Sequence, residues 1–244
     1  MIYVCEHHQA VLELWRREGR RGIRLAHLDF HDDLRGLLID RRRARAYPIG
    51  ALARGAAPLD AGNFLAHAVL ENRLEQIRWI HDRCGGRAFD AGIVRYQSDL
   101  FALPHRLRQA LRRAPEAPLV FEERQLESWG GLETGERLSI DWDCFASILQ
   151  DPSGIETRVA AFLDRLGSQL PPDTYLAYSP EYSRPSIEPF KQLANTLAAR
   201  FRQPVEWLSP ALERGELHPS GVDPLPPRTP LMALILFLRR RGRF

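Results

Sequence analysis

Residues Ile23–Leu34 read I-R-L-A-H-L-D-F-H-D-D-L, an apolar run that passes directly into acids and histidine. The run Ile23–Leu28 predicts a buried strand. Residues two apart on an extended chain point to the same side, so Asp29, His31 and Asp33 are placed to converge on one point. Carboxylates this close repel one another unless a cation or a proton lies between them. The stretch therefore predicts a metal site at the end of a strand.

The donor types narrow the choice of metal. Carboxylate oxygens with one imidazole suit Mn²⁺, Mg²⁺ or Fe²⁺ better than a structural Zn²⁺. The alternative is an acidic turn without a metal, in which Asp32 or Asp33 caps the start of a helix. The stretch alone leaves both interpretations open.

Length and composition favour one globular domain. The chain has 244 residues, 44% of them hydrophobic, and we expect a single domain over residues 1–244. Cys5, Cys84 and Cys144 lie too far apart for a zinc or redox motif and predict buried thiols in a reducing cytoplasm. The N-terminus lacks a secretory signal pattern, and the longest apolar run, Leu231–Leu238, is too short to span a membrane.

Charge gives a weaker indication of partners. The formal net charge is +3, and nearly all of the positive charge is arginine. This mild excess does not favour nucleic-acid binding. The clusters Arg41–Arg45 and Arg239–Arg243 predict solvated surfaces, with contact to acidic partners as the alternative.

Apolar, β-prone runs alternate with amphipathic segments along the chain. We expect strands at Ile2–Cys5, Ile23–Leu28, Phe89–Tyr96, Pro118–Phe121, Arg137–Trp142, Tyr175–Ser179 and, at an edge, Val205–Leu208. We expect helices at His8–Glu18, Asn63–Arg83, Pro104–Arg113, Ile155–Leu166 and Ile187–Phe201, then a proline-rich linker over residues 224–230 and a basic C-terminal helix within residues 231–244. The alternation predicts an α/β protein with three layers, α/β/α, around a mostly parallel sheet.

Acids and histidines follow four of the predicted strands. In open α/β sheets, ligands bind beyond the carboxyl ends of the strands. Asp141 and Asp143 are again two residues apart and can face one site, although an acidic strand end also explains this pair taken alone. Their coincidence with the first cluster favours one shared site. The residues at the four strand ends are Glu6, His7 and His8, then Asp29, His31, Asp32 and Asp33, then Asp141 and Asp143, and finally Glu181.

Five motifs, taken in order, resemble the arginase-like ureohydrolases, which are binuclear manganese enzymes. They are most similar to a branch of peptide arginases, which convert arginine in a ribosomally made precursor peptide to ornithine. The motifs span residues 4 to 185 and read V-C-E-H-H-Q-A-V-L, H-L-D-F-H-D-D-L, D-A-G-N-F-L-A-H-A-V, S-I-D-W-D-C-F and S-P-E-Y-S-R-P. The resemblance implies an arginase/deacetylase-like fold and two Mn²⁺ ions, with Fe²⁺ or Co²⁺ as alternatives.

The resemblance also implies six metal ligands. Asp29 and Asp141 would bridge the two ions. His8 and Asp33 would complete the ligands of the first ion, and His31 and Asp143 those of the second. His8 is favoured over His7 because it keeps the E-x-H-x-x-V-L spacing from Glu6, although a shift of one residue would exchange the two. Asp32 matches a variable position and is expected to cap the chain or support a ligand. Two metals about 3.5–4 Å apart lower the pKa of a shared water, which would attack the guanidinium carbon.

Three further residues are candidates for the substrate site. The resemblance places an acidic substrate-binding residue at Glu181, and a carboxylate pairs well with the planar guanidinium; a surface acid is the alternative. Asn63 either lines the pocket or caps its helix. His67, four residues later on the same helical face, is a candidate donor of the proton to the leaving amine, with a structural role as the alternative.

The expected partner is an arginine-containing precursor peptide. No motif for gripping the α-groups of a free amino acid is found, which fits a site open to a peptide. Tyr182, Arg184 and Arg41–Arg45 are candidates for contact with an acidic leader or core segment. Arginase relatives often form homo-oligomers, but nothing in this sequence identifies an interface.

Two other functions remain as alternatives. One keeps the metals and changes the substrate to a small guanidino compound or to an acylated amine, as in related deacetylases. Those deacetylases usually carry paired histidines in mid-chain, whereas His7 and His8 lie near the start. The other is a basic binding protein that is not an enzyme, which a complete set of six candidate ligands disfavours.

Overall fold

The computed structural model describes residues 1–82, 99–147, 152–168, 171–180, 182–183 and 187–216. Its centre is a seven-stranded sheet in which every neighbouring pair of strands runs parallel. The strands lie in the order β10 (Val205–Trp207), β1 (Ile2–Cys5), β9 (Thr174–Ala177), β8 (Arg137–Asp141), β2 (Ile23–Leu28), β5 (Leu74–His81) and β7 (Val120–Gln125).

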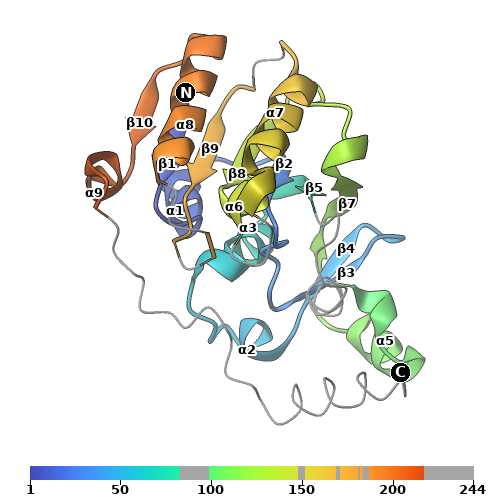
Figure 1. Cartoon of the computed structure of the whole chain (residues 1–244). Helices are drawn as coiled ribbons and strands as arrows, with labels where there is room; N and C mark the ends of the chain where they lie inside the picture. The colour runs from blue at the N-terminus through green and yellow to red at the C-terminus, as the bar shows by residue number, and fades with distance from the viewer. Residues whose placement is uncertain (83–98, 148–151, 169–170, 181, 184–186, 217–244) are drawn as a thin grey trace.

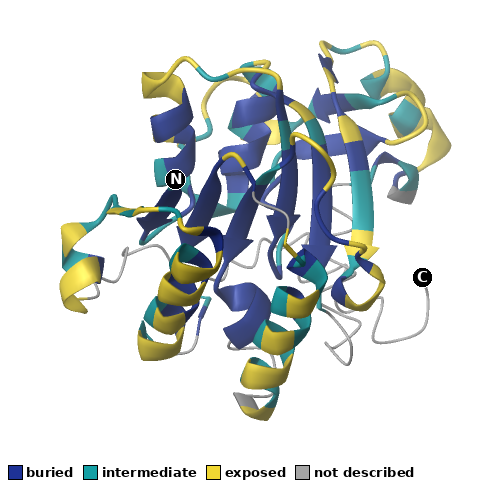
Figure 2. Cartoon of the chain, turned by 90° about the horizontal axis from the view of Figure 1, so that it is seen from above, coloured by how far each residue is buried: buried dark blue, intermediate teal, exposed yellow. Residues whose placement is uncertain are grey.

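Helices cover both faces of this sheet (Figure 1). One face carries α1 (Gln9–Arg17) and α3 (Phe64–Leu70); the other carries α6 (Asp143–Ala146), α7 (Ile155–Leu166) and α8 (Ile187–Phe201). Successive side chains of β1 point to opposite faces of the sheet and so contribute to the hydrophobic core on each face. Tyr3 packs with α1 and α3, whereas Val4 packs with α7 and α8. Figure 2 shows buried strands between helices whose outer sides are exposed. The expected α/β/α architecture is confirmed.

A smaller antiparallel sheet, which begins after β2 in the chain, was not expected from the sequence. It contains β3 (Leu37–Asp40), β4 (Arg45–Pro48) and β6 (Ala117–Pro118). In the chain, α2 (Gly50–Ala53) follows β4, and α5 (His105–Leu111) precedes β6. Its β3–β4 turn holds the arginine cluster, in which Arg41 pairs with Glu123 and Arg45 with Glu116, each at 2.9 Å. The remaining elements are α9 (Pro210–Arg214) and the 3-10 turns Ala61–Asn63, Leu100–Ala102, Leu126–Ser128 and Pro152–Gly154.

The prediction of one long helix over Asn63–Arg83 is wrong. The helix α3 ends at Leu70, Asn72 takes a left-handed φ of +53°, and the chain then forms β5. This strand is paired on both sides, with β2 and β7, and both of its faces are covered. Such a doubly buried strand has an apolar pattern that a helix can equally produce.

Most other elements agree with expectation to within a few residues. The helices at Ile155–Leu166 and Ile187–Phe201 have the expected bounds, and Val205–Trp207 is an edge strand. The strand expected at Pro118–Phe121 is divided between β6 and β7. Phe89–Tyr96, Cys84 and residues 224–244 lie outside the described residues, while Cys5 and Cys144 are buried free thiols. Among the described helices, none combines the length and apolar character needed to cross a bilayer.

Candidate metal centre

Seven acids and histidines meet at the carboxyl ends of three strands. His8 precedes α1 shortly after β1, Asp29 directly follows β2, and Asp141 is the last residue of β8. The sheet places β9 and β8 between β1 and β2, so the site collects residues that are distant in the chain. Ligands of open α/β sheets bind at such strand ends. We refer to the set as the acid–histidine cluster: His8, His27, Asp29, His31, Asp33, Asp141 and Asp143.

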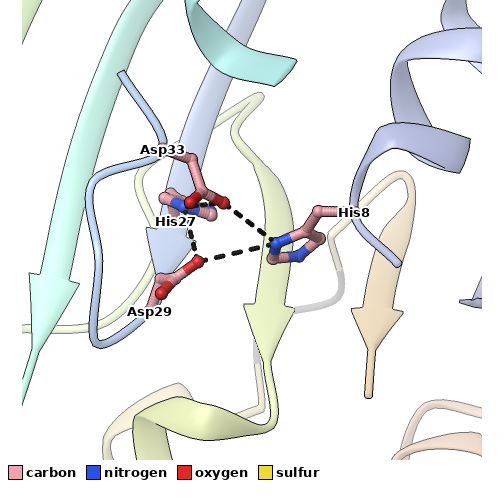
Figure 3. A group of neighbouring side chains, drawn as sticks. All are labelled: His8, His27, Asp29 and Asp33. Atoms are coloured by element: carbon pink, nitrogen blue, oxygen red, sulfur yellow. Dashed lines mark hydrogen bonds and ion pairs between the residues drawn. The ribbon is translucent and has the colours of Figure 1, made fainter. Parts of the chain in front are cut away.

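The first half of the cluster contains two histidines and two carboxylates (Figure 3). His8 Nδ1 lies 3.5 Å from Asp29 Oδ2 and 3.2 Å from Asp33 Oδ2. His27 Nε2 lies 3.1 Å from the same Asp29 oxygen and 3.7 Å from the same Asp33 oxygen. One candidate ligand atom from each of the four residues lies within 4.8 Å of the others, a spacing that can hold one ion.

The second half shares Asp29 with the first. His31 Nδ1 lies 2.9 Å from Asp143 Oδ2 and 3.8 Å from Asp29 Oδ1. Asp29, His31 and Asp143 form a second group with ligand atoms close enough for one ion. The two oxygens of Asp29 therefore face different groups, as a bridging carboxylate requires.

Asp141 approaches the first half from β8. Its Oδ2 lies 3.3 Å from His8 Nδ1 and accepts a hydrogen bond of 2.5 Å from Ser179 Oγ. Ser179 itself has a left-handed φ of +47°, which directs the chain at the end of β9 toward the cluster. The structure thus brings the β8 carboxylate to the histidine from β1.

Backbone amides fix the orientation of the carboxylates. The His31 amide donates to Asp29 Oδ1 at 2.6 Å, and the Phe30 amide donates to Asp143 Oδ1 at 3.1 Å. The Asp143 amide donates in turn to Asp141 Oδ1 at 3.0 Å. These bonds hold the acids in place before any ligand arrives, which is the preorganisation that a binding site needs.

The electrostatics of the cluster favour a bound cation. Burial, and next the Asp143 carboxylate, raise the pKa of Asp29 well above its ordinary value, and the same two causes raise the pKa of Asp141. Burial opposes the charge of His8, yet the Asp141 carboxylate raises the pKa of His8 well above its ordinary value. Burial likewise opposes the charge of Asp33, but the imidazoles of His27 and His8 hold the pKa of Asp33 below its ordinary value. The buried carboxylates thus repel one another and are stabilised by nearby positive charge, which a bound cation would supply.

Buried polar atoms without a hydrogen-bond partner give an independent test of whether the cluster suits a metal ion. Asp29 Oδ2 and both ring nitrogens of His27 are buried without a hydrogen-bond partner among the described residues. Buried polar groups in proteins are almost always hydrogen-bonded, and the exceptions often face an ion. Carboxylate and imidazole donors suit a divalent transition metal. The residues present therefore fit the metal ions that the motif resemblance implies.

Ser139 supports the cluster through His8. Its Oγ lies 3.3 Å from His8 Nε2, which leaves Nδ1 to face the carboxylates. Partners of this kind set the tautomer and orientation of a metal-binding histidine. We expect Ser139→Ala to weaken metal affinity about 10–100-fold, measured by competition with a chelator.

The matched control for this variant is Ser183→Ala. Ser183 is also a buried serine, but its hydroxyl has no hydrogen-bond partner among the described residues. The control should bind metal as the unaltered chain does. Equal affinities for the two variants would contradict a role of Ser139 in orienting His8.

The six predicted metal ligands come together, and the choice between the first two histidines favours His8. His8 lies fully buried in the cluster, whereas His7 Nε2 lies 3.9 Å from Glu6. Asp32 Oδ1 accepts a hydrogen bond from the Leu34 amide at 3.1 Å, a local bond within the loop after β2. Its alternative use as a helix N-cap is not seen, since the chain continues into β3.

Unlike the predicted metal ligands, the residues predicted for the substrate site are not all among the described residues. Asn63 Oδ1 accepts from the Asp60 amide at 2.9 Å, and Asn63 Nδ2 donates to the Pro58 carbonyl at 2.8 Å. The side chain thus completes the capping box of the 3-10 turn Ala61–Asn63, but it makes no capping hydrogen bond to α3 itself. His67 lies on α3, and its Nε2 has no hydrogen-bond partner among the described residues. Glu181 and Arg184 lie outside the described residues.

Three residues of the site were missed from the sequence: His27, Ser139 and Ser179. The signal for His27 was present, because it stands two residues before Asp29 and alternation places both on one face of the chain. Ser139 likewise stands two residues before Asp141. The Ser179 contact depends on a turn after β9 that no local pattern indicates.

No protein-family model and no curated protein matches this chain.

Proposed function

We propose that the chain is a binuclear manganese hydrolase that converts arginine side chains of a precursor peptide to ornithine and urea. The observation that supports it most is Asp29, whose two oxygens face two separate groups of ligand-competent side chains. An isolated acidic turn would not need this sharing. The proposal joins that geometry to the motif resemblance, which supplies the substrate class.

The cluster would hold two ions. In the proposed assignment, Asp29 and Asp141 would bridge the two ions. His8 and Asp33 would complete the ligands of the first ion, and His31 and Asp143 would complete those of the second. Four carboxylates balance the charge of two divalent ions. When bound, such a pair supplies Lewis acidity and a nucleophilic water near neutral pH.

The protein's own groups have to position the arginine and move a proton. Water adds at the guanidinium carbon and the bond from that carbon to Nε breaks. The Nε nitrogen, which carries one hydrogen, takes up the two protons that the water releases, giving the ornithine ammonium group and urea. Glu181 is proposed to pair with the guanidinium, because a carboxylate matches its fork of N–H donors. His67 is proposed, on the sequence alone, to deliver one of these two protons to the leaving nitrogen.

The exposure of the cluster indicates how a substrate would enter. The side chain of His31 is 28% exposed, whereas those of Asp29 and Asp143 are each 1% exposed. The ring of Tyr182 lies 5.2 Å from that of His31, measured between centroids. A side chain inserted past His31 and Tyr182 would reach the buried carboxylates, which suits a long residue such as arginine.

The test combines metal analysis with product analysis. Purified protein loaded with Mn²⁺ is incubated with arginine-containing peptides that also carry an acetylated lysine, with the same peptides in which lysine replaces arginine, and with free arginine. We expect two ions per chain, release of urea, and loss of a CN₂H₂ unit for each converted arginine. Loss of acyl groups with intact arginines would instead indicate a deacetylase. Absence of bound metal together with unaltered peptides would overturn the proposal.

A further inference from the structure

His27 is the least explained member of the acid–histidine cluster. It lies inside β2 and is fully buried. Neither ring nitrogen makes a well-aligned hydrogen bond among the described residues, although Nε2 lies within ion-pair distance of the Asp29 and Asp33 carboxylates. An imidazole is a poor occupant of a core unless its nitrogens are used, because an aliphatic side chain fills such a space without leaving polar atoms unmatched. The burial of this imidazole would therefore be explained if one of its nitrogens bound a metal ion.

The ring points toward the carboxylates of the first half of the cluster (Figure 3). Nε2 lies 3.1 Å from Asp29 Oδ2 and 3.7 Å from Asp33 Oδ2. His8 Nδ1 lies at matching separations of 3.5 and 3.2 Å from the same two oxygens. Donor atoms that share one ion at about 2.1 Å lie up to about 4.2 Å apart, so each of these four separations fits a common ion.

We propose that His27 is a seventh metal ligand, which binds the first ion through Nε2 together with His8, Asp29 and Asp33. The assignment rests on the proposed binuclear centre and deepens it. It makes the two positions unequal, because the first ion has two imidazoles whereas the second has only that of His31. Imidazole-rich positions favour later transition metals, so the two positions should differ in metal preference.

The competing role is that of a positioning residue, which donates Nε2–H to Asp29 and touches no metal. The missing partner at Nδ1 does not separate the two roles, since a positioning histidine and a metal-binding histidine both normally use their second nitrogen. The two roles differ in the number of imidazole nitrogens on the first ion. That number can be measured.

The first experiment uses the unaltered chain loaded with Mn²⁺. Pulsed electron paramagnetic resonance counts the imidazole nitrogens coupled to the metal centre. We expect three histidine nitrogens, from His8, His27 and His31. A count of two would overturn the proposal, and this measurement does not depend on the folding of any variant.

The second experiment compares His27→Gln with His81→Gln. Glutamine keeps an N–H donor near the position of Nε2 and so preserves a positioning role. We expect His27→Gln to weaken binding of one Co²⁺ ion at least 100-fold, as followed by the visible absorption of Co²⁺, since even partners behind a ligand contribute about 10–100-fold. His81, a buried histidine on the adjacent β5, lies outside the cluster, and its variant should bind both ions normally.

The outcomes separate this inference from the proposed function. Two bound ions with three nitrogens but no urea release would retain the ligand and refute the arginine hydrolase. Urea release with normal metal binding by His27→Gln would retain the hydrolase and refute the ligand. Failure of the unaltered chain to bind Mn²⁺ or Co²⁺ would refute both.

Discussion

Replacing Asp29 by asparagine is expected to remove both metal ions and to lower the rate of urea release by at least about 1,000-fold. Asp29 is the residue common to both groups of ligand atoms, so its loss affects two positions at once. Asparagine has the same shape and still accepts the hydrogen bond from the His31 amide, so the loop should keep its conformation. What is lost is the negative charge and the second anionic oxygen. Metal content per chain and urea release measure the two effects.

The neighbouring carboxylate provides the control. Asp32→Asn keeps the acceptor for the Leu34 amide and changes the net charge by the same amount, but Asp32 belongs to neither group of ligand atoms. This variant should bind both ions and remain active. Retention of two tightly bound ions by Asp29→Asn would show that Asp29 does not bridge, and the proposed ligand assignment would then be wrong.

Replacing Arg78 by alanine is expected to lower the free energy of unfolding by about 3–5 kcal/mol. Arg78 lies on β5, where its Nε donates to Glu136 Oε1 at 3.0 Å and its Nη2 donates to the Gly131 carbonyl at 3.0 Å. The Glu136 side chain is fully buried. Without the guanidinium, a buried carboxylate is left with no opposite charge, and this penalty is large beside the total stability of about 5–15 kcal/mol of a typical domain.

Urea denaturation of the metal-free chain measures this loss. The comparison is Arg124→Ala on the adjacent β7, where the pair with Glu122 is exposed at 2.8 Å and should contribute no more than about 1 kcal/mol. The double change Arg78→Met with Glu136→Leu should recover much of the lost stability, because it removes both charges. Equal effects of Arg78→Ala and Arg124→Ala would contradict a structural role for the buried pair.

The sequence predicted the layers of the fold well and failed where local patterns are ambiguous. Amphipathic helices such as Ile155–Leu166 have one apolar face and were placed correctly. The strand Leu74–His81 is covered on both faces, so its apolar residues have no single period and were interpreted as helix. The β3–β4 hairpin was missed because its strands are short and its turn is rich in arginine.

At the site, the chemistry was more predictable than the geometry. From the sequence, Asp29, His31 and Asp33 are expected to converge by alternation along an extended chain. They lie instead in a loop after β2, where Asp33 takes a left-handed φ of +50°. That loop turns Asp33 toward His8 and His31 toward Asp143, and only Asp29 joins the two. The ligands were identified, but their division into two groups depends on tertiary structure.

The position of β8 between β2 and β9 has a consequence for how the protein matures. A nascent chain that has emerged only through β7 carries His8, Asp29, His31 and Asp33, but it lacks the strand that delivers Asp141 and the helix that begins at Asp143. It therefore lacks one of the two proposed bridging carboxylates, and β1 and β2 are not yet joined through β9 and β8. Metal capture should accordingly come late, after the C-terminal strands have inserted into a sheet begun by the N-terminal ones. Acquisition of the second ion would then report that the whole sheet has assembled.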